Sequence, residues 1–167
     1  MALLTKLATS NTTPDPAQGG AAVTTPSNTG HASTTSSGLN GTGEQKSCIW
    51  QGFTAAGGQI ATVTLKVTHT SSGSLSGAGS NNFILEYSLN GGGAWNTAVS
   101  RSNYTSSQGP TVFSVPLSIS QNLTQVRVRD FIDATTFDMG DSATATATIS
   151  TIQIEVVTVD GRLVVMM

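Results

Sequence analysis

The chain has 167 residues, of which only 10% are charged, and its formal net charge is −2. A protein that binds duplex nucleic acid needs clustered Lys and Arg to neutralise phosphates, so the seven scattered basic residues argue against that class. The single cysteine, Cys48, excludes an intramolecular disulfide framework and a cysteine-based zinc site. The length is sufficient for one compact domain with an apolar core.

The first residues contain an apolar turn but no export signal. Leu3, Leu4 and Leu7 are spaced as on one face of a short helix, which would either fray or order on docking to a partner. Lys6 interrupts the apolar run too early for a signal-peptide core, and no later stretch is long enough to span a bilayer. We therefore expect a soluble protein that is not exported by the Sec route.

Residues 8–43 form a polar, low-complexity tract. Its prolines and paired glycines discourage regular structure, so the sequence predicts a flexible tether when the chain is free. We define residues 1–43, with a possible docking turn at 1–8, as the N-terminal arm, and residues 44–167 as a folded domain. Such an arm can become ordered by wrapping around neighbouring subunits.

From residue 44 onward, alternating Val, Ile, Leu and Thr separated by Gly and Asn predict β-strands. We place a loop at 71–82 and a final hairpin that turns at Asp160-Gly161. Pro116 indicates an edge strand, and a phase change in the last long strand predicts a bulge near Ser150. The strands are expected at residues 46–53, 60–70, 83–89, 95–99, 111–119, 122–132, 143–159 and 162–167.

Seven or eight short strands with Gly-rich turns, and no convincing helix after residue 44, predict an all-β fold. The expected architecture is an antiparallel β-sandwich of immunoglobulin-like or jelly-roll type with an extended N-terminal arm. The order of the strands is not readable from this pattern. Cys48 is expected to be a small buried residue beside Trp50.

The segment from Ser88 to Trp95, with the sequence SLNGGGAW, resembles the Asp-box hairpin S-x-D-x-G-x-T-W of sialidase-like propellers and of many β-sandwich modules. Asn90 and Ala94 stand where the pattern has Asp and Thr. A single copy does not make a propeller. In that family the box is a folding element remote from catalysis, so the resemblance implies only a hairpin with Trp95 packed at its turn.

Four of the nine acidic residues lie close together in the sequence, at positions 130, 133, 138 and 141. An oxygen-rich loop of this kind can chelate Ca²⁺, with Asp133, Asp138 and Asp141 as candidate ligands. The alternative is a solvated loop in which Asp130 pairs with Arg127 or Arg129.

Candidate catalytic residues are few. The only histidines are His31 in the arm and His69 at a strand end, and no catalytic or phosphate-binding motif accompanies them. We therefore expect neither an enzyme nor a bound cofactor. For a sugar-binding module the candidate aromatic platform is Trp95 with Tyr104, and Trp50 is a further candidate.

The C-terminus ends in five apolar residues, of which Leu163, Val164, Val165 and Met166 are candidate assembly residues. An exposed apolar edge strand promotes aggregation, so this segment must be covered. It either packs in its own sandwich or completes the sheet of a neighbouring subunit.

Taken over its whole length, a signal-less, weakly charged, Thr-rich sandwich with an extended arm resembles bacteriophage virion accessory proteins, such as capsid decoration proteins and tail or neck components. The resemblance implies a non-enzymatic structural subunit that binds capsid or tail proteins through its arm and sheet edges, without nucleic-acid or membrane partners. It also implies a location in the virion after synthesis in the host cytoplasm. The alternative is a carbohydrate-binding or adhesive module at a cell surface, reached by non-Sec export, with surface glycans as partners.

Overall fold

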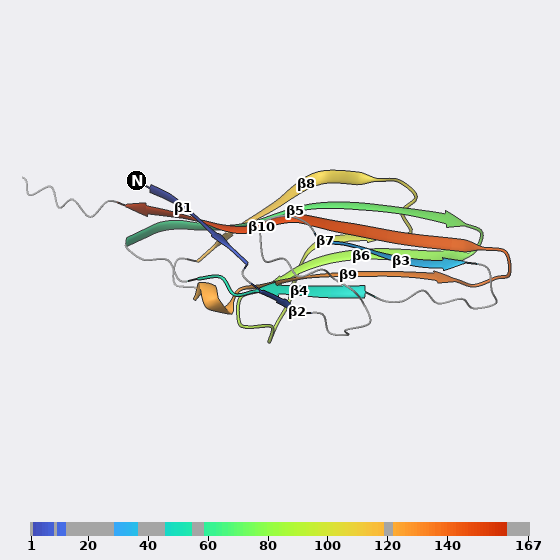
Figure 1. Cartoon of the computed structure of the whole chain (residues 1–167), viewed down its shortest axis with the longest axis horizontal. Helices are drawn as coiled ribbons and strands as arrows, with labels where there is room; N and C mark the ends of the chain where they lie inside the picture. The colour runs from blue at the N-terminus through green and yellow to red at the C-terminus, as the bar shows by residue number, and fades with distance from the viewer. Residues whose placement is uncertain are drawn as a thin grey trace, which may run out of the picture.

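The computed structural model describes residues 2–8, 10–12, 29–36, 46–54, 59–118 and 122–159. Two antiparallel sheets pack face to face in a long, flat molecule (Figure 1). The all-β antiparallel sandwich predicted from the sequence is confirmed. The only helical element in these ranges is a 3₁₀ turn at Leu123–Gln125, and no helix described here has the length and apolar character to cross a membrane.

Within the described ranges, each sheet contains five strands. Sheet A has β10 between β5 on one side and β1 with β3 on the other, and β8 forms its far edge. Its strands are β1 (Ala2–Leu7), β3 (Thr29–Ser36), β5 (Gln59–Ser76), β8 (Gln108–Leu117) and β10 (Ser142–Val159). Sheet B has the order β2-β4-β9-β6-β7. Its strands are β2 (Ser10–Thr12), β4 (Lys46–Gln51), β6 (Gly79–Ser88), β7 (Asn96–Ser102) and β9 (Arg127–Thr136).

The long strand β10 forms the centre of the molecule. Its residues alternate between buried and half-buried positions along both halves, and the alternation changes parity after Ile149. The pairing with β5 shifts its register between Ile149 and Thr151, so the bulge predicted near Ser150 is confirmed. Because the bulge absorbs one residue, both halves of β10 direct their apolar side chains into the same core.

The core changes in character along the molecule. Toward one end it is filled by large side chains, including Trp50, Phe83 and Leu65, all fully buried. Toward the turn between β9 and β10, it is lined by the buried alanines at positions 143, 145 and 147 of β10 and by polar side chains such as Asn81. Cys48 is fully buried, as predicted, and it lies on the same buried face of β4 as Trp50.

Asn81 joins the two sheets in the polar part of the core. Its side chain is fully buried, and its Nδ2 donates to the carbonyl oxygens of Tyr104 and Thr144, each at 2.8 Å. Its Oδ1 accepts from the backbone N–H of Tyr104 at 2.8 Å. One amide side chain therefore takes the place of an apolar contact between β6 and β10.

The segment 71–82 is not a loop, so this prediction was wrong. β5 continues to Ser76, and β6 begins at Gly79, which leaves a tight turn at Gly77 and Ala78. Gly77 has φ +79°, and Asp141 accepts a hydrogen bond from the N–H of Ala78 at 2.7 Å. The extension forms because β10 offers a long partner, although the local sequence is polar.

The helical turn expected at Leu3, Leu4 and Leu7 was also wrong. These residues belong to β1, which pairs antiparallel with β10 from Ala2–Thr158 to Leu7–Gln153. Within the tract expected to be an irregular tether, β2 pairs with β4, and β3 pairs with the first half of β10. The described parts of residues 1–43 thus lie within the two sheets rather than apart from them.

The remaining strand predictions agree in most places. Pro116 lies in β8, at the edge of sheet A as expected. The hairpin through Asn90 joins β6 to β7, as the Asp-box resemblance implied. The final hairpin predicted at residues 160–167, with its candidate assembly residues, lies outside the described residues.

Candidate functional site

The outer face of sheet B contains a hollow with both charged and apolar lining. It has a volume of about 260 Å³ and is lined by Ser47, Ile84, Glu86, Arg129 and Phe131. We call it the sheet-B hollow. Two cross-strand pairs form most of it, because Glu86 lies opposite Arg129 and Ile84 lies opposite Phe131 in the pairing of β6 with β9. A row formed by the charged pair and a row formed by the apolar pair therefore lie next to each other on one face of the sheet.

Arg129 is held in place from two sides. Its Nε donates to Glu86 Oε2 at 2.5 Å, and its guanidinium carbon lies 4.1 Å from the centre of the Trp95 ring. The stacked arrangement combines an ion pair with a cation–π contact. Among the described residues, the two terminal nitrogens of Arg129 and Oε1 of Glu86 have no hydrogen-bond partner. Donors and an acceptor thus remain available at the hollow.

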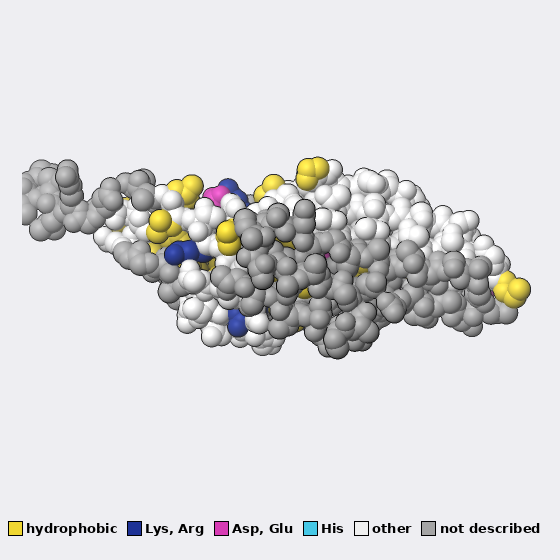
Figure 2. Space-filling view, in the orientation of Figure 1, with side chains coloured by type: hydrophobic (Ala, Val, Ile, Leu, Met, Phe, Trp, Pro, Cys, Tyr) yellow, Lys and Arg dark blue, Asp and Glu magenta, His cyan; other side chains and the backbone are white. Residues whose placement is uncertain are grey.

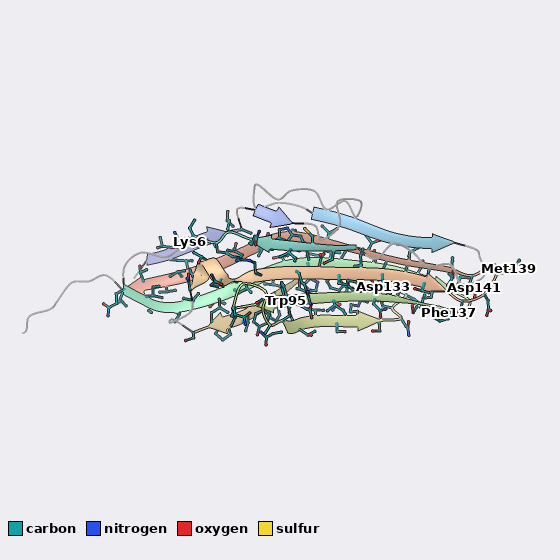
Figure 3. All side chains as sticks on the ribbon, turned by 90° about the horizontal axis from the view of Figure 1, so that it is seen from below. Lys6, Trp95, Asp133, Phe137, Met139 and Asp141 are labelled. Carbon is teal, nitrogen blue, oxygen red and sulfur yellow. The ribbon has the colours of Figure 1, made fainter. Side chains whose placement is uncertain are left out.

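The hairpin between β6 and β7 supplies Trp95. Ser88 Oγ donates to Asn90 Oδ1 at 2.9 Å and accepts from the N–H of Gly92 at 2.9 Å. Asn90 Oδ1 also accepts from the N–H of Ala94 at 2.9 Å. The asparagine thereby makes the hydrogen bonds that an oxygen side chain at the Asp position of the box can make. A rigid turn places Trp95 against Arg129, at the position labelled in Figure 3.

The aromatic platform expected from Trp95 and Tyr104 is not formed. Tyr104 is only 6% exposed, and Arg101 lies over its ring with the guanidinium carbon 4.4 Å from the ring centre. Burial raises the pKa of Tyr104 to about 12. Trp95 remains half-buried, and Trp50 is fully buried. Of the three aromatic candidates, Trp95 alone is accessible.

The expected acidic loop is not formed either. Asp130 and Asp133 lie within β9, and Asp138 and Asp141 lie in or beside the turn that follows it. Asp133 accepts a hydrogen bond from Asn82 Nδ2 at 3.2 Å, and Figure 3 shows it well away from Asp141 at the tip. Within the described ranges, no group of three or more His, Cys, Asp or Glu is placed to hold a metal ion.

Asp130 points into the core rather than toward an arginine, which corrects the expected pairing with Arg127 or Arg129. It is fully buried, and its Oδ1 accepts from the N–H of Cys48 at 3.1 Å. Burial raises the pKa of Asp130 well above its ordinary value, although the hydrogen bond from Cys48 opposes the shift. Arg127 instead donates to the carbonyl oxygens of Thr124 and Val126.

The two histidines lie in different strands of sheet A. His69 is only 1% exposed in the middle of β5, with its ring centre 5.5 Å from that of Phe83. Neither ring nitrogen has a hydrogen-bond partner in the described part of the chain. Burial, together with the charge of Arg101, lowers the pKa of His69. His31 lies in β3, opposite Ala147 of β10.

Three of the candidate assembly residues, Leu3, Leu4 and Leu7, lie in the described part of the chain, in the edge strand β1. Leu3 and Leu4 of β1 are 61% and 38% exposed. At the other end, the turn after β9 exposes Phe137 and Met139, both labelled in Figure 3. Figure 2 shows apolar side chains toward both ends of the long molecule and few charged ones on the face it displays. Leu7 is half-buried.

No protein-family model matches the chain, and no curated protein matches its sequence. Its function therefore has to be inferred from the geometry of the sheets and their surfaces.

The sequence predicts that some of these side chains face outward, but it does not predict that Glu86, Arg129 and Trp95 lie together. Period-two alternation predicts that Glu86 and Arg129 point away from the core. That β6 and β9 are neighbours, with these two residues opposite each other, depends on pairing between strands distant in sequence. The Asp-box resemblance drew attention to Trp95, but no signal in the sequence identified Arg129 as its partner.

Proposed function

We propose that the chain is a non-enzymatic structural subunit of a multi-protein assembly, and that the assembly is a bacteriophage virion in which the chain is a capsid decoration or tail-associated protein. In this proposal its partners are capsid or tail proteins, including further copies of the chain. The supporting observation is the way in which the N-terminal strands complete sheet A along β10.

The side of β10 opposite β5 is well suited to pair with added strands. It runs from Ser142 to Val159 without a proline and with Glu155 as its only charged residue, so its backbone can pair along its full length. In contrast, the edge strand β8 contains Pro110 and Pro116, which cannot donate backbone hydrogen bonds. Of these two strands, β10 is therefore the better acceptor of an added strand.

Two N-terminal strands occupy this side of β10. β1 pairs with residues 153–158, and β3 pairs with residues 142–149. The same pairing can be made by these strands from a second copy, because strand exchange replaces one set of backbone hydrogen bonds with an identical set. The exposed Leu3 and Leu4 add apolar surface where such a neighbour would lie.

Light scattering of the full chain beside a variant that begins at Glu44 tests this proposal. We expect the full chain to form oligomers of defined mass, and the shortened chain to lose them. A double variant with serine at Phe137 and Met139 is the matched control, because it removes exposed apolar side chains without changing the side of β10. This control should retain the oligomer.

Deletion of the N-terminal strands also leaves β10 uncovered, so the shortened chain is expected to be prone to aggregation. A synthetic peptide of residues 1–43 should then bind it and restore a defined mass. Two results together would refute the proposed role of these strands. The full chain would remain monomeric even at the protein concentration of an assembled particle, and the peptide would not bind the shortened chain.

A further inference from the structure

We propose that the sheet-B hollow binds a neutral carbohydrate, with Glu86 and Arg129 as its hydrogen-bonding groups. This inference is separate from the assembly role, because it concerns the outer face of sheet B and not the edge of sheet A. It also places sugar recognition at residues other than the Trp95–Tyr104 pair suggested by the sequence.

The first argument is the available hydrogen-bonding capacity. Arg129 uses only its Nε for Glu86, and its side chain is 35% exposed, so its terminal N–H groups can donate to a ligand. Glu86 uses only Oε2, so Oε1 can accept. Neighbouring sugar hydroxyls both donate and accept, and a carboxylate beside a guanidinium satisfies both functions at once.

The second argument is the apolar row beside these charges. Ile84 and Phe131 lie two residues further along the same face of β6 and β9, which separates the two rows by about 7 Å. Both side chains are half-buried, so part of their apolar surface remains accessible to a ligand. A sugar ring has one apolar C–H face and a rim of hydroxyls, and it can cover Ile84 and Phe131 while its rim reaches Glu86 and Arg129.

The third argument concerns charge. Glu86 and Arg129 neutralise each other, so the hollow has no net charge to attract an anion, and Glu86 would repel a phosphate or sulfate. Trp95 covers one face of the guanidinium and fixes its plane, which reduces the entropy lost when a ligand binds. Trp95 is therefore a positioning residue, and Glu86 and Arg129 make the contacts.

Nuclear magnetic resonance of the ¹⁵N-labelled full chain provides a site-specific test. Glucose, galactose, mannose and N-acetylglucosamine, each also as a short oligosaccharide, are titrated to about 50 mM, well above the ~1 mM dissociation constant expected for a shallow site. At least one should shift the Trp95 indole N–H and the Arg129 Nε–H signals. Glu86→Gln and Arg129→Lys should weaken this binding about tenfold or more.

The matched control is Glu155→Gln, which disrupts the other described ion pair between opposite charges, Lys66–Glu155 at 2.9 Å, on sheet A. It should bind the sugar as the natural chain does. No shift with any of these sugars, or equal binding by the Glu86 and Arg129 variants, would overturn the proposal. Preferential binding of inorganic phosphate, strengthened by Glu86→Gln, would also overturn it by making the hollow an anion site. None of these outcomes alters the masses measured for the assembly proposal, so the two can fail independently.

Discussion

Asn81→Leu tests whether the buried amide that joins the sheets stabilises the fold. Leucine has a similar size, so the substitution removes hydrogen bonds while leaving little empty volume. The change deprives the N–H of Tyr104 of its acceptor, and it deprives the carbonyl groups of Tyr104 and Thr144 of a donor. The two contacts with Tyr104 are buried, so water cannot readily replace the lost partner there.

The expected cost follows from these contacts. An unsatisfied buried N–H costs about 1–3 kcal/mol, and each carbonyl that loses one bond costs about 0.5–1 kcal/mol more. We therefore expect the free energy of unfolding to fall by about 2–5 kcal/mol, a large part of the ~5–15 kcal/mol typical of a domain. The fold should survive, but with a clearly lower midpoint of unfolding.

Urea unfolding followed by tryptophan fluorescence measures this change, because Trp50 is fully buried in the folded chain. The matched control is Asn82→Leu, on the next residue of the same strand. Asn82 faces outward and its side chain makes one hydrogen bond, to Asp133 at 3.2 Å, so its loss should cost less than about 1 kcal/mol. If the two variants lose equal stability with unchanged denaturant slopes, the role assigned to Asn81 is wrong.

Three further substitutions test the packing and the titration of the core. In Gly73→Ala, the new Cβ would lie 2.6 Å from Asn81 Nδ2 and 2.9 Å from the carbonyl oxygen of Thr144, so we expect a loss of about 1–3 kcal/mol. Thermal unfolding beside Ser72→Ala checks this, and equal melting temperatures would contradict it. For Asp130, a pKa raised by burial means that the folded chain binds the proton more tightly, so its contribution to stability falls as the pH rises above about 4. Asp130→Asn should therefore gain stability relative to the natural chain between pH 4 and pH 8, whereas a constant difference in unfolding free energy would argue against a titrating Asp130. For His69, the lowered pKa means that stability is lost as the pH falls below about 6.5. His69→Leu should flatten this loss in denaturation curves between pH 7 and pH 5, and parallel profiles would exclude it.

The sequence predicts best where side chains alternate strongly. The core strand around Phe83 and Leu85 and the phase change at Ser150 both follow from the two-residue period of a strand, which is a local property. Pro116 predicts an edge because a missing N–H is tolerated only there. These features need no knowledge of which strands are neighbours.

The sequence predicts poorly where pairing is imposed by a distant strand. Residues 71–76 and 29–36 are mostly small and polar, yet both segments are strands because β10 provides backbone partners on its two sides. The same reason explains why the sheet-B hollow was missed, since Glu86 and Arg129 meet only through the pairing of β6 with β9. Propensity is a weak guide when tertiary pairing decides the conformation.

The position of β10 has a consequence for how the protein is made. β10 is the last described strand in the sequence, yet it lies at the centre of sheet A, and Ala2 pairs with Thr158 almost a full chain length away. Sheet A therefore cannot be completed until β10, which follows every other described strand in the sequence, has left the ribosome, and its many distant pairings favour slow folding. Until then, β1, β3 and β5 lack the strand with which all three pair. The β10 strand of another copy can therefore pair with them first.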